Sequence, residues 1–282
     1  MRQYLDLLKK VMDEGDDRET RNGKTRALFG MQMRFDMSGG FPAMTTKKLA
    51  WKAVKSELLW FIEGSGDDNR LKELNGSEKT IWTANAHSDY WKPKAKFDGD
   101  LGRVYGVQWR KWQKPDPSTG SGQADTVDQI ANVIERIKKD PTDRRLIVSA
   151  WNPGELDQMA LPPCHMFFQF FVAKNKLSLL MHQRSCDVFL GVPFNIASYS
   201  LLLHMVAQVT NLTPHEFVHS LGDVHIYHDH FDAVTEQLKR EPMPLPQLKL
   251  NPNVKNIDDF TMEDIELENY QSHPTIKANM AV

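Results

Sequence analysis

Residues 195–210 form a stretch that is apolar on most faces. Its centre reads Leu201-Leu202-Leu203. A helix of this kind is stable only when other elements surround it, so we expect it in the core of a folded domain. The stretch is shorter than the roughly 20 apolar residues that a transmembrane helix needs. We therefore predict a buried helix and no membrane span.

Segments with strand and helix patterns surround this stretch in an irregular order. Apolar and β-branched runs predict strands at 146–151, 166–172, 177–181, 217–219, 224–227 and 247–250, with a hairpin turn at 173–176. Apolar residues at helical spacing predict helices at 4–12, 50–63, 127–137 and 229–240. Charged or polar composition indicates irregular segments at 16–27, 64–100 and 115–122. Because helices and strands do not alternate regularly, we predict the α+β class.

Composition narrows the classes of protein to which the chain can belong. The 282 residues include 35 Lys and Arg against 37 Asp and Glu, a net charge of -2. This balance argues against a protein built mainly to coat nucleic acid or an anionic membrane. The first residues lack an apolar signal core, so we expect no export signal. With only two cysteines, a disulfide scaffold is ruled out, and we expect a cytoplasmic protein.

The two cysteines are the first candidates for chemistry. Cys164 follows a rigid Pro162-Pro163 turn and precedes an apolar strand, so the thiol could be held in a pocket wall. The alternative is a small buried hydrophobic residue, which is what most free cysteines are. Cys186 stands beside charged residues. The two thiols do not form a Cys-x-x-Cys pair, so a redox pair has little support.

Glu57 is a second candidate, because it falls on the apolar stripe of the predicted 50–63 helix. It lies three residues after Val54 and four before Phe61. A carboxylate there lies either at the edge of the stripe or inside a cavity. Burial in a cavity would raise its pKa and suit it to proton transfer.

Histidines and arginines supply two further candidate sites. His225, His228 and His230 could hold a metal, but without a cysteine partner or a His-Glu-x-x-His pattern they indicate one only weakly. Hydrogen bonds on a polar face are the alternative for these histidines. Four arginines in predicted loops could each bind a phosphate through two hydrogen bonds from the guanidinium, or could be surface charges: Arg21, Arg184 and the adjacent pair Arg144 and Arg145.

Several long motifs, taken together, strongly resemble the folate-dependent thymidylate synthase family. The resemblance covers nearly the whole chain and rests on residues 30–35, 45–48, 57–61, 100–106, 144–145, 161–165, 183–187, 190–199 and 222–227. It implies one domain over residues 1–282, with a small variable insertion region at about 64–125. It also implies a twisted mixed sheet with flanking helices, and a homodimer in which two sheets pack back to back.

The resemblance implies a reaction as well as a fold. The expected reaction is the reductive methylation of deoxyuridine monophosphate (dUMP) to thymidylate. The co-substrate 5,10-methylenetetrahydrofolate would donate both the carbon and the hydride, so that no metal, nicotinamide or flavin is required. The alternative is a dUMP or dCMP hydroxymethylase on the same scaffold. A non-enzymatic RNA-binding relative is the third reading, and the near-neutral charge argues against it.

Site residues follow from the same motif matches. The implied catalytic residues are Cys164, Glu57, Arg184, Asn195, His165 and Tyr105. The implied dUMP ligands are Arg21, Arg144, Arg145, Arg184, Ser185, Asp187, Asn195, His225 and Tyr227, with Arg144 and Arg145 reaching across the dimer. The implied folate ligands are Trp82, Asn85, Asp187, Leu161 and Ala281. Lys47 and Lys48 are either contacts for a polyglutamate tail or solvated lysines.

The chain departs from the family pattern at a few positions. Thr20 replaces a common Asp, Arg103 a common Pro, and His182 a common Tyr. His228 and Asp229 replace an apolar residue and an Asn. None of these removes a core catalytic group, but His182 and Arg103 could alter the pocket lining or tune folate affinity.

Overall fold

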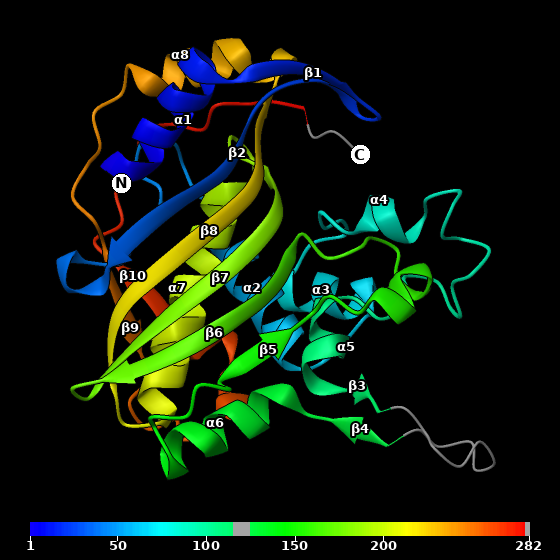
Figure 1. The fold of residues 1–282 in the computed structure, drawn as a ribbon, viewed down its shortest axis with the longest axis vertical. Helices are drawn as coiled ribbons and strands as arrows, with labels where there is room; N and C mark the ends of the chain where they lie inside the picture. Colours follow the sequence, from blue (N-terminus) through cyan, green and yellow to red (C-terminus); the bar gives the residue numbers. More distant parts are fainter. Residues whose placement is uncertain (115–124, 280–282) are drawn as a thin grey trace.

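A mixed six-stranded sheet forms the centre of the computed structural model, which describes residues 1–114 and 125–279 (Figure 1). Its strands are β1 (Asp16–Thr20), β2 (Gly23–Asp36), β5 (Ile147–Ser149), β6 (His165–Ala173), β7 (Lys176–Asp187) and β8 (Thr213–Tyr227). Their order across the sheet is β1-β2-β8-β7-β6-β5, and only the β7–β8 pair is parallel among these strands. Two small two-stranded sheets pair β3 (Trp112–Gln113) with β4 (Thr126–Val127) and β9 (Gln247–Leu250) with β10 (Ile265–Glu268). The predicted α+β class is confirmed.

Helix α7 (Gly191–Val209) connects the two parallel strands and packs against both. Fifteen of its residues are buried, which confirms the predicted core helix. The helix begins four residues earlier than predicted, because Pro193 lies in the first turn, where a missing N–H costs nothing. By length and composition α7 could cross a membrane, but 83% of its apolar window is buried inside the protein.

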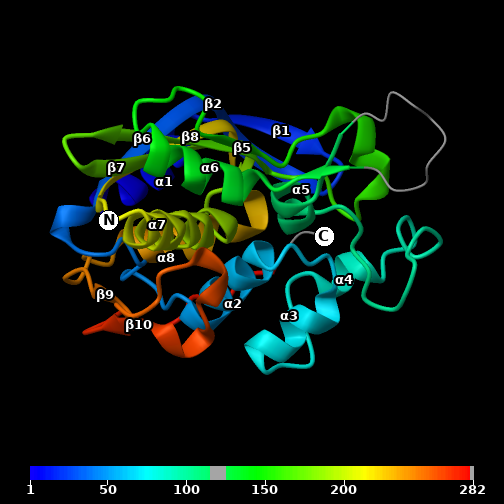
Figure 2. The ribbon, with the colours of Figure 1, turned by 90° about the horizontal axis from the view of Figure 1, so that it is seen from below.

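The remaining helices flank the sheet, and Figure 2 shows α7 and α2 beneath it. They are α1 (Arg2–Glu14), α2 (Trp51–Ile62), α3 (Asp68–Asn75), α4 (Thr83–Ala86), α5 (Tyr105–Arg110), α6 (Gln129–Lys139) and α8 (Phe231–Leu238). The helices predicted at 4–12, 50–63, 127–137 and 229–240 are confirmed to within about two residues at each end. One continuous cluster of buried apolar side chains extends from α1 to β10.

Three predictions for irregular segments or strands need correction. Residues 16–27 are not a loop but a hairpin of β1 and the start of β2; all five β1 residues are exposed, so no alternation marks the strand. Helices α3 and α4 lie in the polar segment 64–100. The strands predicted at 217–219 and 224–227 are one strand, β8. The predicted loop at 115–122 lies outside the described residues.

Candidate active site

Cys164 lies immediately before β6 and is held through both of its backbone groups. Its N–H donates to the hydroxyl of Tyr105, 2.7 Å away, and its carbonyl accepts from the N–H of Arg184 at 2.9 Å. The Arg184 guanidinium stabilises the Pro162–Pro163 turn before Cys164, because its Nε and Nη2 donate to the carbonyls of Pro163 and Pro162, each at 2.9 Å. The thiol therefore occupies a fixed position beside a cation.

The Cys164 thiol does not have the depressed pKa that its arginine neighbour suggests. Burial raises the pKa of Cys164, and the charge of Arg184 and the Tyr105 hydroxyl offset only part of that rise. The positive charge of Arg184 lowers the pKa of Cys164, but desolvation outweighs this effect. In the free protein Cys164 is a thiol at neutral pH, so a nucleophilic role needs a proton acceptor. Cys186 is fully buried, which also raises its pKa, and fits a small hydrophobic residue.

Glu57 lies in the middle of α2 and meets an aromatic cluster. The indole N–H of Trp82 donates to Glu57 Oε1 at 2.8 Å. Burial raises the pKa of Glu57 to about 7, although the Trp82 hydrogen bond opposes the rise. Of the two sequence interpretations, this desolvation favours an enclosed carboxyl over one exposed at the edge of the stripe. A carboxyl that titrates near neutral pH is suited to accept and return protons.

His165 and Asn195 form a buried polar pair next to Tyr105. The Asn195 side-chain nitrogen lies 2.8 Å from His165 Nε2, and an amide nitrogen can only donate. Burial lowers the pKa of His165 to about 3, so the ring is neutral. The Tyr105 ring packs on His165 with a centroid distance of 4.8 Å. The pair thus offers neutral hydrogen-bonding groups next to the Cys164 turn.

The buried face of β7 and β8 changes within each strand, and this turns a set of polar side chains into a cavity. In the earlier part, odd-numbered residues such as Gln183 and Leu221 are buried in the core; further along, the buried residues are even-numbered, such as Cys186 and Val224. Gly222 lies at this change, where a Cβ would lie 2.9 Å from the carbonyl oxygen of Arg184. Ser185, Asp223, His225 and Tyr227 follow the change and line a cavity of about 210 Å³, which we call the polar cavity; its other lining residues are Thr20, Arg21, Asn22 and Thr25.

A second cavity, of about 510 Å³, adjoins the first and shares Arg21 and Asn22 with it. Its other lining residues are largely aromatic or apolar, and we call it the apolar cavity: Ile81, Trp82, Asn85, Ser88, Tyr90, Ala160, Leu161 and Pro162. Three of the predicted folate ligands, Trp82, Asn85 and Leu161, therefore line one cavity. The shared Arg21 joins it to the predicted phosphate and sugar ligands.

Other predicted ligands lie outside the two cavities. Arg144 and Arg145 are exposed just before β5. Asp187 Oδ1 accepts from the N–H groups of Phe189 and Leu190, each at 3.0 Å, at the turn that leads into α7. Ala281 lies outside the described residues. Within the described residues, the Arg144–Arg145 pair, Arg184 and Asn195 therefore line neither of these two cavities.

The position of Lys47 fits neither interpretation offered from the sequence, a contact for a polyglutamate tail or a solvated lysine. Its side chain is only 8% exposed, its ammonium lies 3.5 Å from the Phe189 ring centre, and it donates to the Phe189 carbonyl. Burial lowers the pKa of Lys47 to about 7, and the charge of Asp187 opposes this. Lys47 is therefore neither solvated nor free to meet a polyglutamate tail, whereas Lys48 is exposed.

The departures from the family pattern have local structural explanations. Arg103 pairs with Glu155 at 2.7 Å, and His182 Nδ1 lies 3.0 Å from the Ser220 hydroxyl. Neither is among the residues that line the polar or the apolar cavity. The Thr20 hydroxyl donates to the Gly23 carbonyl and closes the β1–β2 turn.

The three neighbouring histidines point to separate partners. His225 Nδ1 lies 3.0 Å from Asp223, His228 Nε2 lies 3.0 Å from Asp17, and His230 Nε2 lies 2.7 Å from the Asn279 carbonyl. Within residues 1–114 and 125–279, no group of three or more His, Cys, Asp or Glu side chains could hold a metal ion.

Sequence reasoning missed two polar groups that support the site. Arg18 donates to Asp223 Oδ2 at 2.6 Å, and this carboxylate also contacts His225. Asp223 lies within the 222–227 motif, which was a usable signal, but nothing in the sequence marked Arg18. The second group is the hydrogen bond between Gln183 and His219, at 2.9 Å.

The site thus combines a fixed thiol, a carboxyl that titrates near pH 7, a neutral amide–imidazole pair and an arginine-lined polar cavity. Comparison with known protein families gives one match: the model described as thymidylate synthase matches residues 2–282. This match covers essentially the whole chain, and the chain therefore belongs to the thymidylate synthase family.

Proposed function

We propose that the protein converts dUMP to thymidylate, with 5,10-methylenetetrahydrofolate as the co-substrate and dihydrofolate as the second product. The observation that carries this proposal is the pair of adjoining cavities that share Arg21. One is polar and arginine-bearing, as a nucleotide phosphate and sugar require. The other is larger and has an aromatic and apolar lining, as a flat heterocyclic co-substrate requires.

The nucleotide is held by charge at one end and by hydrogen bonds at the other. Arg21, Arg184 and Ser185 bind the phosphate, and His225 and Tyr227 bind the sugar hydroxyl. Asn195 pairs with the uracil O4 and N3–H, since an amide accepts and donates at once. The 2.8 Å contact between the Asn195 nitrogen and His165 supports this role, because it orients the amide before the base arrives.

Cys164 supplies the nucleophile. C5 of uracil is a poor nucleophile, and addition of the Cys164 thiolate to C6 converts the ring to an enolate that is nucleophilic at C5. Because burial raises the pKa of Cys164, the addition to C6 also requires that the thiol proton pass to an acceptor. Glu57, whose burial raises its pKa to about 7, organises proton transfer near O4, with His165 and Tyr105 in the same network.

The apolar cavity takes the folate. Trp82, Leu161 and Asn85 line its ring site, Asp187 binds the pterin, and the C-terminal segment with Ala281 covers it. The folate supplies the one-carbon unit and then the hydride, so the proposal requires no metal, nicotinamide or flavin. Exclusion of water by the lining favours hydride transfer to the exocyclic methylene over hydration.

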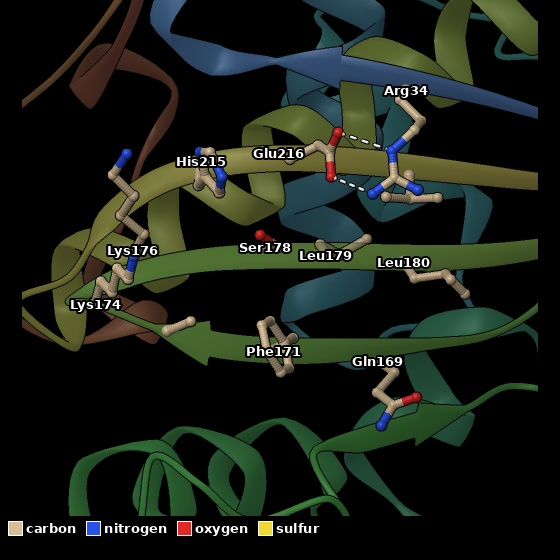
Figure 3. A pocket seen from close by; sticks show the side chains of 12 residues that line it. Arg34, Gln169, Phe171, Lys174, Lys176, Ser178, Leu179, Leu180, His215 and Glu216 are labelled. Carbon is tan, nitrogen blue, oxygen red and sulfur yellow. Dashed lines mark hydrogen bonds and ion pairs between the residues drawn. The ribbon is translucent and has the colours of Figure 1, made fainter.

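We further propose that two copies associate through the sheet face opposite α7, within the cytoplasm, with residues 1–282 acting as one domain. Support comes from apolar side chains exposed on that face, Ile147 at 44% and Phe171 at 65%. Figure 3 shows part of the face, an open groove of about 570 Å³ whose sides carry Phe171 and the Arg34–Glu216 ion pair. In such a dimer Arg144 and Arg145 would complete the partner's phosphate site.

The two cysteines provide a matched test of this function. Cys164→Ser should reduce turnover of dUMP by at least about 10³-fold, because a hydroxyl is a far weaker nucleophile at neutral pH than a thiol. It should still bind dUMP in calorimetry, because the arginines and Asn195 remain. Cys186→Ser should retain most of the activity. Substantial turnover by Cys164→Ser would remove Cys164 from the mechanism.

A further inference from the structure

Two buried histidines flank Gln183, and each has an unused ring nitrogen. His219 is fully buried and His165 is 9% exposed. Within the described residues, Nδ1 of each ring has no hydrogen-bond partner. A buried polar atom without a partner costs about 1–3 kcal/mol, so the two atoms call for an explanation.

The proton positions on His219 follow from a backbone carbonyl. The Ser185 carbonyl can only accept, so the Gln183 side-chain nitrogen donates to it, at 2.9 Å. Gln183 Oε1 is then the acceptor for His219 Nε2–H, also at 2.9 Å. Burial lowers the pKa of His219 to about 3, so the ring is neutral and carries one proton. His219 Nδ1 is therefore a bare acceptor.

The proton position on His165 follows from the other end of the network. Asn195 donates to His165 Nε2, and the neutral ring therefore carries its proton on Nδ1. His165 lies opposite Gln183 in the β6–β7 register, and His165 also contributes to the lowered pKa of His219. The donor His165 Nδ1–H and the acceptor His219 Nδ1, neither of which has a partner among the described residues, thus lie on either side of Gln183.

We propose that His219 is a positioning residue that sets base specificity, through a buried water that accepts from His165 Nδ1–H and donates to His219 Nδ1. The chain of hydrogen bonds then has a single direction, from Asn195 through His165, the water, His219 and Gln183 to the Ser185 carbonyl. Water of this kind is a normal structural component where polar atoms surround a small buried space. The inference rests on the proposed function, because it concerns how that site reads a pyrimidine.

The direction of the chain decides what Asn195 presents to the base. With its nitrogen turned to His165, Asn195 offers Oδ1 as the acceptor for a ring N3–H, which uracil has and cytosine lacks. The opposite tautomer of His165 would donate from Nε2 and turn the amide oxygen towards itself. The amide nitrogen would then face the base and match the bare N3 of cytosine. His219 thus favours uracil without touching it.

Two substitutions at His219 separate its two functions, the hydrogen bond from Nε2–H to Gln183 and the acceptor at Nδ1. His219→Gln keeps a donor near the position of Nε2 for Gln183 but removes the acceptor at Nδ1. His219→Asn keeps a polar group near Nδ1 and loses the bond to Gln183. His204→Gln is the matched control, because its buried Nε2 also has no partner among the residues that the structure describes, but His204 packs against Phe41.

The measurements are the ¹⁵N chemical shifts of the His165 ring and the affinities for dUMP and dCMP in calorimetry. We expect His165 to be protonated at Nδ1 in the wild type and in His204→Gln. In His219→Gln we expect a mixture of tautomers and a loss of about tenfold in the preference for dUMP, the effect of one neutral hydrogen bond. His219→Asn should lose less than His219→Gln.

Two results would overturn the inference: protonation of wild-type His165 at Nε2, or His219→Gln behaving like His204→Gln in both measurements. Failure of the proposed function would look different. Wild-type protein would then give no thymidylate from dUMP, while the His165 tautomer and its response to His219→Gln would still decide the role of His219.

Discussion

Replacing Glu57 by Gln should abolish activity, and it should stabilise the protein by an amount that grows as the pH rises from about 4.5 to 7. Burial raises the pKa of Glu57 from 4.5 to about 7, so the folded protein holds the proton more tightly than the unfolded chain. The folded state therefore loses stability as the pH rises from 4.5 through 7. Each pH unit corresponds to about 1.4 kcal/mol, so ionised Glu57 costs the fold about 3 kcal/mol at alkaline pH.

Urea unfolding of wild type and Glu57→Gln measures this cost. We expect Glu57→Gln to gain about 2–3 kcal/mol at pH ~8.5 and less than about 1 kcal/mol at pH ~5. Its turnover should fall by about 10²- to 10⁴-fold, the usual contribution of a positioned proton-transfer group. The Trp82 N–H can still donate to the amide oxygen, so local packing should persist.

Glu155→Gln is the control, because Glu155 is buried with partners of its own. Arg103 lies 2.7 Å and Gln108 2.6 Å from its Oε2. Losing this carboxylate leaves Arg103 without its ion partner, so stability should fall by a few kcal/mol at both pH values. A Glu57→Gln variant that is destabilised at pH ~8.5, or equally stabilised at both pH values, would refute the assignment of Glu57 as a desolvated carboxyl with a raised pKa.

Three further predictions address the nucleotide site. Asn195→Asp should shift preference from dUMP towards dCMP, because a carboxylic side chain suits the donor at position 4 and the bare N3 of cytosine; equal ranking of both nucleotides in wild type and variant would remove Asn195 from base recognition. Mixed Cys164→Ser and Arg145→Glu subunits, each inactive alone, should recover part of the activity through hybrid dimers; no recovery despite verified subunit exchange would argue against a shared site. Asp223→Asn should raise the KM for dUMP by about tenfold with little change in kcat, because Asp223 orients His225 and pairs with Arg18 at 2.6 Å; an unchanged KM would leave this carboxylate without a role in binding.

Sequence patterns predicted best those elements whose buried apolar residues are regularly spaced along the chain. The 195–210 stretch and the 50–63 helix carry continuous or one-sided apolar patterns, and both helices form. The hairpin at 173–176 has Lys174 and Asn175 at positive φ, as a two-residue turn requires. These features depend only on neighbouring residues, so the sequence alone is enough to predict them.

The features that could not be predicted depend on contacts between distant segments. β1 has no buried face, and β8 changes its buried face at Gly222, so neither shows a regular alternation. Lys47 is buried by packing against Phe189, which lies 142 residues further along the chain. The sequence placed Glu57 on an apolar stripe, but only the fold brings Trp82 to it. The identity of the site residues came from motif resemblance rather than from pattern.

We propose that Cys164, Glu57 and Asn195 act together to methylate a uracil nucleotide. To test this, the purified protein is incubated with dUMP and 5,10-methylenetetrahydrofolate, the mass of the nucleotide product is determined and the folate product is identified. We expect thymidylate and an equal amount of dihydrofolate. A hydroxymethylated nucleotide with tetrahydrofolate would contradict it, because water rather than a hydride would then have met the exocyclic methylene.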